Sequence, residues 1–219
     1  MKYKAVLFDL DGTLLDTIVD LADAMNVVLA RMGFPAHPVE PYKYFVGNGL
    51  VNIVRRALPE DSRDEETVAL AAAGMSEQYA KHWAEKSRPY DGVRQLLDEL
   101  AARNIAMAVL SNKPDEFTRQ MVAHFFDGCP FSLVFGARPD VPLKPDPAAA
   151  IEIAGRLDIP PAEFLYLGDT GTDMQTACAA GCYAVGATWG FRPADELTEN
   201  GAKTLIKHPA ELLELIQRG

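Results

Sequence analysis

The chain has 219 residues, of which 48% are hydrophobic, so it can bury a substantial core, either as one large domain or as a core with a smaller module. Its formal net charge of −10 argues against a nucleic-acid partner, because phosphate backbones bind basic surfaces. No apolar run approaches the roughly 18 residues of a membrane span. The three cysteines, odd in number and without zinc-type spacing, are typical of buried thiols in a reducing compartment. We expect a cytoplasmic protein that binds neither nucleic acid nor membrane.

The first predicted element is a short buried strand over residues 5–8, and it ends in paired acids. Asp9 and Asp11 follow the apolar run directly, and Gly12 then breaks the regular structure. Buried carboxylates are costly unless something compensates their charge, and oxygen ligands suit a hard cation such as Mg²⁺. The alternative is structural, with the two acids forming a polar strand end and an Asx turn.

A series of helices is expected next. Residues 16–32 carry apolar side chains at helical spacing, and Gly33 is a plausible end for that helix. Residues 41–83 contain further helical segments and no convincing strand, and around residues 87–92 the composition becomes that of a linker. We predict that residues 17–86 form a helical insert, the name used below, within a core made of residues 1–16 and 87–219.

From residue 93 onward, helical segments alternate with short apolar strands. This pattern predicts right-handed crossovers and a Rossmann-like parallel sheet with helices on both faces, an α/β fold. The predicted helices cover residues 93–103, 117–126, 148–157, 174–180 and 210–217, and the predicted strands cover residues 105–110, 133–135, 164–167, 183–185 and 204–206.

Several polar residues follow the predicted strands, at the edge of the sheet where ligands bind in open parallel sheets. Ser111 follows residues 105–110, Asp169 follows residues 164–167, and Lys144 lies in a rigid loop after residues 133–135. Asp173 lies in the first turn of the next helix. Each residue alone has a structural interpretation, as a helix-entry hydroxyl, a complement to the helix dipole or a solvated lysine. Their convergence on one edge favours a shared site.

Four ordered motifs carry a resemblance to a known family. They are Asp9-Leu10-Asp11-Gly12-Thr13, Ser111-Asn112-Lys113-Pro114, Lys144-Pro145, and Gly168-Asp169 followed by Asp173. In order and spacing they resemble the motifs of the haloacid-dehalogenase superfamily, and the helical insert resembles its C1 cap. Within the insert, Val46-Gly47-Asn48-Gly49-Leu50 followed by Arg56 is similar to the cap of the phosphoglycolate phosphatases.

The resemblance implies a Mg²⁺-dependent phosphatase that acts on a small anionic phosphorylated metabolite, with 2-phosphoglycolate as the first candidate. Asp9 would attack phosphorus and form an aspartyl-phosphate, and Asp11 would exchange protons with the leaving group and with water. Site roles are implied for further residues as well: metal binding by Asp9, Asp11 (through its carbonyl), Asp169 and Asp173, and phosphate binding by Gly12, Thr13, Ser111, Asn112 and Lys144.

In the insert, the resemblance implies that Gly47, Asn48 and Gly49 approach the substrate as a closing lid. Arg56 has two interpretations, as the partner of a substrate carboxylate or as an exposed helix arginine.

Other functions stay open. An inorganic pyrophosphatase shares the same phosphoryl chemistry, and so does a sugar-phosphate phosphatase or phosphomutase. The mutase pattern places a histidine where this chain has Leu21. A dehalogenase is disfavoured, because it would not need Asp11 or Asp169. A catalytically silent binding module is disfavoured as well, because it would not need the intact motifs. Either a monomer or a homodimer is compatible with the sequence.

Overall fold

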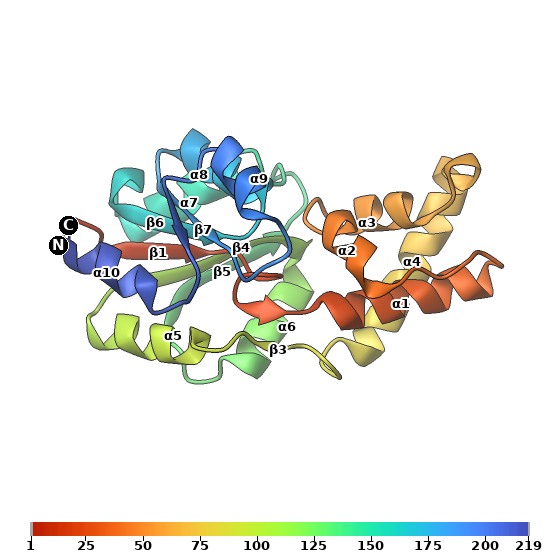
Figure 1. The fold of residues 1–219 in the computed structure, drawn as a ribbon, viewed down its shortest axis with the longest axis horizontal. Coiled ribbons are helices and arrows are strands. Elements are labelled where there is room, and N and C mark those ends of the chain that lie inside the picture. Colours follow the sequence, from red (N-terminus) through yellow and green to blue (C-terminus); the bar gives the residue numbers. More distant parts are fainter. Residues whose placement is uncertain (1, 219) are drawn as a thin grey trace.

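A parallel sheet forms the larger of two bodies in this computed structural model, which describes residues 2–218 (Figure 1). In the described part of the chain the sheet has six strands in the order β5-β4-β1-β6-β7-β8, and neighbouring strands pair in parallel. The strands are β1 (Ala5–Phe8), β4 (Ala106–Pro114), β5 (Phe131–Ala137), β6 (Phe164–Gly168), β7 (Tyr183–Ala187) and β8 (Thr204–Ile206). The chain adds β4 and β5 on one side of β1 and then β6 to β8 on the other, so the strand order reverses at β1. Ligands bind at such a switch point in open α/β sheets.

Helices cover both faces of the sheet, as predicted. One face packs against α5 (Val93–Ala102), α6 (Asp115–Phe125) and α10 (Glu211–Arg218), and the other against α7 (Ala148–Leu157), α8 (Gly171–Ala180) and α9 (Ala194–Glu199), with a short 3-10 helix at Pro161–Glu163. In β1, Val6 and Phe8 join the first cluster while Ala5 and Leu7 join the second. The strand is therefore apolar at every position, because both of its faces are buried.

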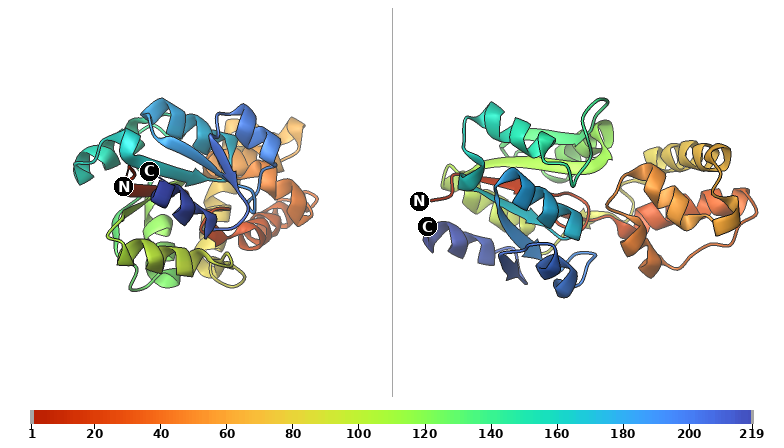
Figure 2. Two further views of the ribbon diagram at one scale, coloured as in Figure 1. Left: turned by 60° about the vertical axis from the view of Figure 1, so that its left-hand side comes forward. Right: turned by 90° about the horizontal axis from the view of Figure 1, so that it is seen from above.

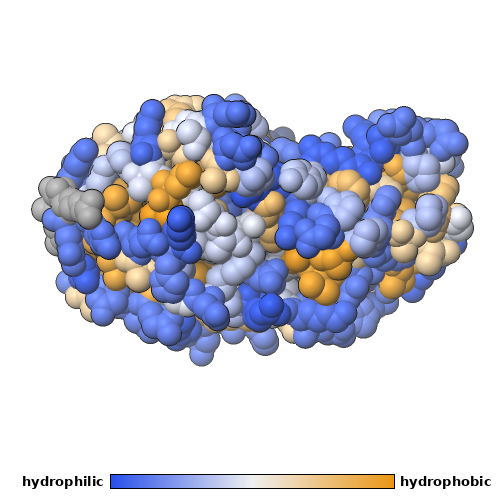
Figure 3. All heavy atoms as spheres, viewed as in Figure 1, coloured by the Kyte–Doolittle hydropathy of each residue, from blue (hydrophilic) through white to orange (hydrophobic). Residues whose placement is uncertain are grey.

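The helical insert is a separate body at the carboxyl-terminal edge of the sheet. It consists of α1 (Ile18–Arg31), α2 (Val39–Phe45), α3 (Leu50–Ala57), a 3-10 turn at Glu60–Ser62, and α4 (Glu65–His82). Leu29, Tyr42 and Met75 belong to a hydrophobic cluster made largely of its own side chains. Two chain segments join it to the sheet (Figure 2), and the surface is indented between the two bodies (Figure 3). The bounds of the insert at residues 17 and 86 stay a prediction.

Several elements differ from the prediction. The linker contains β3 (Arg88–Pro89), which pairs antiparallel with β2 (Leu15–Asp16) where the chain enters and leaves the insert. Strand β4 was predicted to end before Ser111, but it continues to Pro114, with a shift of register against β5. Helix α9 was not predicted, because six residues show too little of a helical period. In the described part of the chain, no helix is long and apolar enough to cross a membrane.

Candidate active site

Three buried carboxylates meet at the edge of the sheet. Asp9 follows β1 and Asp169 follows β6, and these two strands are direct neighbours, so their ends lie together. Asp173 comes from the first turn of α8. One carboxylate oxygen from each residue lies within 4.8 Å of the others, and all three residues are buried. The predicted convergence of Asp9, Asp169 and Asp173 is therefore present in the structure.

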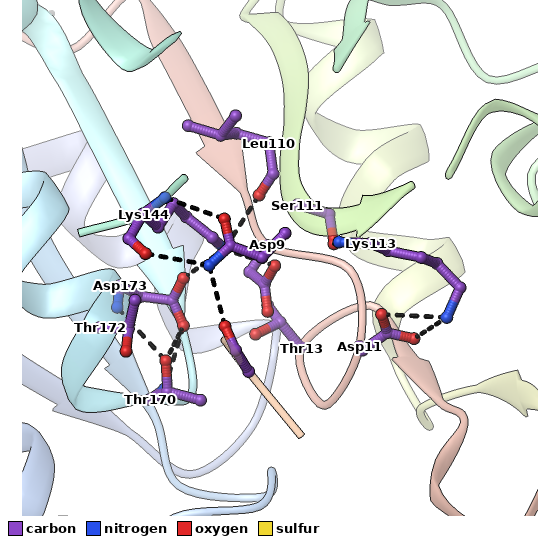
Figure 4. A network of polar contacts seen from close by, with 12 residues as sticks. Asp9, Asp11, Thr13, Leu110, Ser111, Lys113, Lys144, Thr170, Thr172 and Asp173 are labelled. Carbon is purple, nitrogen blue, oxygen red and sulfur yellow. Dashed lines mark hydrogen bonds and ion pairs between the residues drawn. The ribbon is translucent and has the colours of Figure 1, made fainter. Parts of the chain in front are cut away.

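Lys144 lies between two of these acids (Figure 4). Its ammonium donates to Oδ1 of Asp9 at 2.7 Å, to Oδ1 of Asp173 at 2.6 Å and to the carbonyl of Leu110 at 3.1 Å. An ammonium has three N–H donors, so all of them are used. Lys144 is 6% exposed, which rules out the solvated-lysine interpretation.

The charges in this cluster are not balanced. Burial raises the pKa of Asp9 well above its usual range, and the charge of Asp173 adds to that effect while Lys144 opposes it. Burial, followed by the charge of Asp173, raises the pKa of Asp169 to about 7. For Lys144, burial lowers the pKa, but Asp173 and Asp9 outweigh it and the pKa is raised well above its usual range. One ammonium serves three carboxylates, so the cluster favours a further cation.

The loop after β1 leaves room for Asp169 and orients it. Thr13 donates from its hydroxyl to Oδ1 of Asp169 at 2.9 Å, and the Phe191 N–H donates to Oδ2 at 2.7 Å. Gly12 has a φ of +95°, and a Cβ added there would lie 2.3 Å from Oδ2 of Asp169. Only glycine fits both this backbone conformation and this close approach.

The same loop corrects one expectation. The N–H groups of Gly12 and Thr13 were expected to donate to a phosphate. In the structure they donate to the carbonyls of Leu15 and Leu10, at 2.8 and 3.3 Å. Each amide has a single proton, so neither group is free for a ligand in this conformation.

Asp173 combines a structural role with a role in the site. Its Oδ2 accepts from the Thr170 hydroxyl at 2.6 Å and from the Thr170 N–H at 3.1 Å, in a capping box that begins α8. Its Oδ1 accepts from Lys144. The helix-terminus interpretation therefore holds for one oxygen, while the other positions the lysine.

The carboxylate of Asp11 points away from this cluster, toward Lys113. The Lys113 ammonium donates to Oδ1 and Oδ2 of Asp11 at 2.9 and 3.2 Å, and the Thr17 hydroxyl donates to Oδ1 at 2.7 Å. The ammonium also lies 4.5 Å from the centre of the Tyr79 ring, a cation–π contact. Burial lowers the pKa of Lys113, but Asp11 outweighs it and the pKa is raised. Any part that Asp11 plays in metal binding must therefore come from its backbone carbonyl.

Ser111 and Asn112 line the same cavity but are held differently. The Ser111 hydroxyl accepts from the Lys113 N–H at 3.2 Å. The Asn112 side chain donates to the carbonyls of Lys144 and Gly47, at 3.0 and 2.9 Å, and accepts from the Lys144 N–H at 2.9 Å. Asn112 thus connects the loop that carries Lys144 to the helical insert.

The loop over residues 46–49 of the insert contacts the core, mainly through its backbone carbonyls. Besides Gly47, the carbonyl of Val46 accepts from Arg192 at 3.0 Å, and the Asn48 side-chain amide donates to the Thr172 hydroxyl at 3.4 Å. Gly47 and Gly49 have φ values of +116° and +84°, which glycine adopts without strain.

Arg56 hydrogen-bonds to the end of α2 and to Asn48 of this loop, and it does not line the cavity. Its guanidinium donates to the carbonyls of Tyr44 and Phe45 and to the Asn48 side-chain oxygen. Arg56 as the partner of a substrate carboxylate is therefore corrected, because the residue is exposed, lies outside the cavity lining and uses three of its five N–H donors within the insert. Asn48 contacts Arg56 of the insert and Thr172 of the core, and it does not line the cavity either.

The groups described above enclose a small cavity of about 50 Å³ between core and insert. Its polar end holds Asp9, Asp11, Ser111, Asn112, Lys113 and Lys144, and its apolar end includes Leu21, Val46, Leu50, Ile53, Met75 and Phe117. One water needs roughly 10–15 Å³ by a comparable measure, so the closed cavity has room for only a few water-sized groups.

Comparison with known proteins then assigns the family. The family described as haloacid dehalogenase-like hydrolase matches residues 6–187. The chain belongs to this family. A phosphoglycolate phosphatase of Thiobacillus denitrificans is 32% identical over 223 residues, which cover 100% of this chain and 97% of that protein. A phosphoglycolate phosphatase of Pseudomonas syringae pv. tomato is 34% identical over 208 residues, which cover 93% and 76%.

A solved structure of the same family has nearly the same fold. The protein, from Lactobacillus delbrueckii subsp. bulgaricus and predicted to be a phosphoglycolate phosphatase, superposes with a TM-score of 0.93 at 31% identity, and the match covers 99% of each chain. The predicted family, the predicted α/β fold and the predicted hydrolase class are confirmed.

Sequence reasoning assigned no role to two residues of this haloacid dehalogenase-like hydrolase. Lys113 lies in the motif Ser111-Asn112-Lys113-Pro114, and Tyr79 lies in a helix of the insert. Lys113 comes three residues after the predicted strand over residues 105–110, and Tyr79 follows no predicted strand. The nearest signal was the polar run at residues 111–113 directly after an apolar strand, which could have suggested that all three face the site.

Proposed function

We propose that this haloacid dehalogenase-like hydrolase is a Mg²⁺-dependent phosphatase that hydrolyses a small phosphate monoester, with 2-phosphoglycolate as the favoured substrate. The observation that carries the proposal is the arrangement of Asp9, Lys144 and Asp173, in which a buried lysine holds the proposed nucleophile at the end of β1. The names of the curated relatives support the substrate.

The donor set fits Mg²⁺. Asp9 and Asp169 would hold the ion through their side chains and Asp11 through its carbonyl, while Asp173 orients Lys144. Carboxylate and carbonyl oxygens are the ligands that this hard cation takes, and the three buried carboxylates have one ammonium among them. When bound, Mg²⁺ shields Asp9 from the incoming anion and stabilises charge on the phosphoryl group.

The residues of the chain perform the covalent steps in this proposal. An oxygen of Asp9 forms a bond to phosphorus as the ester P–O bond breaks. Asp11, which must leave its ion pair with Lys113 and carry a proton for this step, gives that proton to the departing alkoxide. Asp11 then takes a proton from a water molecule, whose oxygen attacks phosphorus and releases Asp9 and phosphate. Lys144 neutralises charge on Asp9 and on the phosphoryl oxygens, and Ser111 and the Asn112 N–H donate to those oxygens.

The cavity supports a small substrate. A cavity of about 50 Å³ suits a small ester better than a nucleotide. Leu21 lines the cavity where the phosphomutase pattern has a histidine, so the chain has no group there to return a phosphate to a sugar. We also propose that the protein acts in the cytoplasm, as a monomer or homodimer. Its three cysteines are free thiols, which fits a reducing compartment. The expectation that they are buried was wrong, since Cys178 is exposed and Cys129 and Cys182 are half-buried.

The test is Asp9→Asn assayed with Mg²⁺ on p-nitrophenyl phosphate and on 2-phosphoglycolate, pyrophosphate, hexose phosphates and nucleotides. We expect the wild type to prefer 2-phosphoglycolate and the variant to lose turnover on every substrate. Asp146→Asn is the matched control, because Asp146 is exposed and lies two residues from Lys144. Near wild-type turnover by Asp9→Asn would contradict the covalent route. A wild type that prefers pyrophosphate would show that pyrophosphate, and not 2-phosphoglycolate, is the substrate.

A further inference from the structure

The cavity holds two buried cations with different surroundings. Among the described residues that line it, Lys113 and Lys144 are the positively charged ones. They are 8% and 6% exposed, so both charges are largely removed from water. A buried charge of this kind needs a partner, and the partners available to the two lysines differ.

Lys144 has no donor left for a second ligand group. Asp9, Asp173 and the carbonyl of Leu110 accept its three N–H groups. Lys113 instead gives both of its hydrogen bonds to the two oxygens of one carboxylate, that of Asp11. Its remaining close contact is the face of the Tyr79 ring. The charge of Lys113 is therefore met by one carboxylate and one neutral phenol side chain, whereas Lys144 has two carboxylates and a carbonyl.

Lys113 also lies where the organic part of a substrate must lie. Asp11 is the proposed proton donor to the leaving oxygen, and Lys113 contacts Asp11 directly on the side away from Asp9 and Lys144 (Figure 4). A substituent one carbon beyond the leaving oxygen would therefore meet Lys113. The same cavity is lined by several apolar side chains, among them Leu50, Ile53 and Phe117, and the Phe117 ring packs against that of Tyr79. An anionic substituent there has a strong need for a cation, because apolar walls cannot solvate it.

We propose that Lys113 binds the carboxylate of the substrate and so selects phosphate esters whose phosphorylated carbon carries a carboxylate. This assignment rests on the proposed phosphatase function and deepens it. Arg56, the other candidate for that partner, bonds to Tyr44, Phe45 and Asn48 and does not line the cavity. Lys113 is thus a specificity-determining residue, while Lys144 serves the phosphoryl end.

The experiment compares 2-phosphoglycolate with ethyl phosphate, two esters of similar size in which a carboxylate replaces a methyl group. The quantity measured is the ratio of their kcat/KM values in Mg²⁺. In Lys113→Met we expect this ratio to fall by at least about tenfold, because kcat/KM falls more for 2-phosphoglycolate than for ethyl phosphate. In Lys113→Arg, which keeps the positive charge, we expect most of the ratio to remain. Arg56→Met should lower both values together and leave the ratio unchanged.

Lys113→Gln covers the case in which the methionine variant does not fold, because a glutamine can still donate to Asp11 without carrying a charge. An unchanged ratio in the uncharged variants would overturn the proposal and leave Lys113 as a positioning residue for Asp11. A wild type that hydrolyses both esters equally well would overturn it as well, with the phosphatase function intact. Hydrolysis of neither ester would instead overturn the proposed function.

Discussion

The side chain of Asn112 and the backbone of Lys144 are joined by two reciprocal hydrogen bonds. The Asn112 amide donates to the Lys144 carbonyl at 3.0 Å, and the Lys144 N–H donates to the Asn112 side-chain oxygen at 2.9 Å. The same amide group also donates to the carbonyl of Gly47 in the helical insert. One side chain therefore fixes the backbone that carries the lysine and links it to the closed insert.

Asn112→Ala removes all three of these bonds. We expect kcat to fall by about 100-fold, since a displacement of roughly 1 Å in a positioned group has effects of that size. Steady-state kinetics on the preferred phosphate ester would measure this. Asn26→Ala is the matched control, because Asn26 makes the same reciprocal pair with the backbone of His37 inside the insert. Equal losses of kcat in the two variants would show that the effect is general destabilisation.

Gly12→Ala introduces a clash at the proposed metal site. The new Cβ would lie 2.3 Å from Oδ2 of Asp169, so the carboxylate has to move. We expect the thermal stabilisation by Mg²⁺ to disappear and turnover to fall to background. Gly33→Ala is the control for backbone strain: Gly33 has a φ of +79° and nothing within 4 Å of an added Cβ. The control should cost about 1–2 kcal/mol of stability and keep its response to Mg²⁺. A normal Mg²⁺ response in Gly12→Ala would remove Asp169 from the ligand set.

Asp20→Ala tests the connection between the insert and the sheet. Asp20 is 3% exposed and accepts from the Lys86 N–H, the Ser87 N–H and the Ser87 hydroxyl. Hydrogen bonds to a charged group contribute about 1.5–3 kcal/mol, so we expect a loss near 3 kcal/mol. For a chain of this size that lowers Tm by roughly 6–12 °C, measurable by calorimetry.

The control for that variant is Asp23→Asn. Asp23 pairs with the exposed Lys86 side chain on the surface, so its removal should leave Tm nearly unchanged. Similar Tm values for Asp20→Ala and the wild type would mean that this connection contributes little to stability.

Stabilisation by Mg²⁺ should depend on pH in a defined direction. The pKa of Asp169 is raised from 3.8 to about 7 by burial and by Asp173. Between those values the folded protein binds more protons than the unfolded chain, so the metal-free protein loses stability as pH rises. Mg²⁺ must displace that proton, so its apparent affinity should fall by about tenfold per pH unit below pH 7. Thermal melts with and without Mg²⁺ from about pH 5 to pH 9 would measure this, and a shift in Tm that is constant across the range would contradict it.

Much of the core was predictable because its signals are local. β1 is apolar at every position, since both faces of the sheet are covered, and that made the acids at its end conspicuous. β8, which spans Thr204–Ile206, and α7, which spans Ala148–Leu157, were predicted with the bounds found. The cluster around Lys144 followed from the rule that the ends of parallel strands meet at one edge.

The rest depends on tertiary contacts that no local pattern carries. The ion pair of Lys113 with Asp11 joins residues 102 positions apart, and its lysine lies in a strand that continues through polar residues. Of the two interpretations of Arg56, the exposed helix arginine is the correct one, and its contacts could not be predicted because two of its partners are backbone carbonyls, which look alike in any sequence. The two-residue strands β2 and β3 are stable only because they meet each other.

That small ribbon has an evolutionary consequence. Because Leu15–Asp16 and Arg88–Pro89 are hydrogen-bonded neighbours, the chain departs from the sheet and returns to it at almost the same point. A different module could be spliced between them without altering the path of a single central strand. The part of the cavity lining that comes from the insert can therefore change by exchange of the segment between β2 and β3, while Asp9, Lys144, Asp169 and Asp173 keep their places at the edge of the sheet.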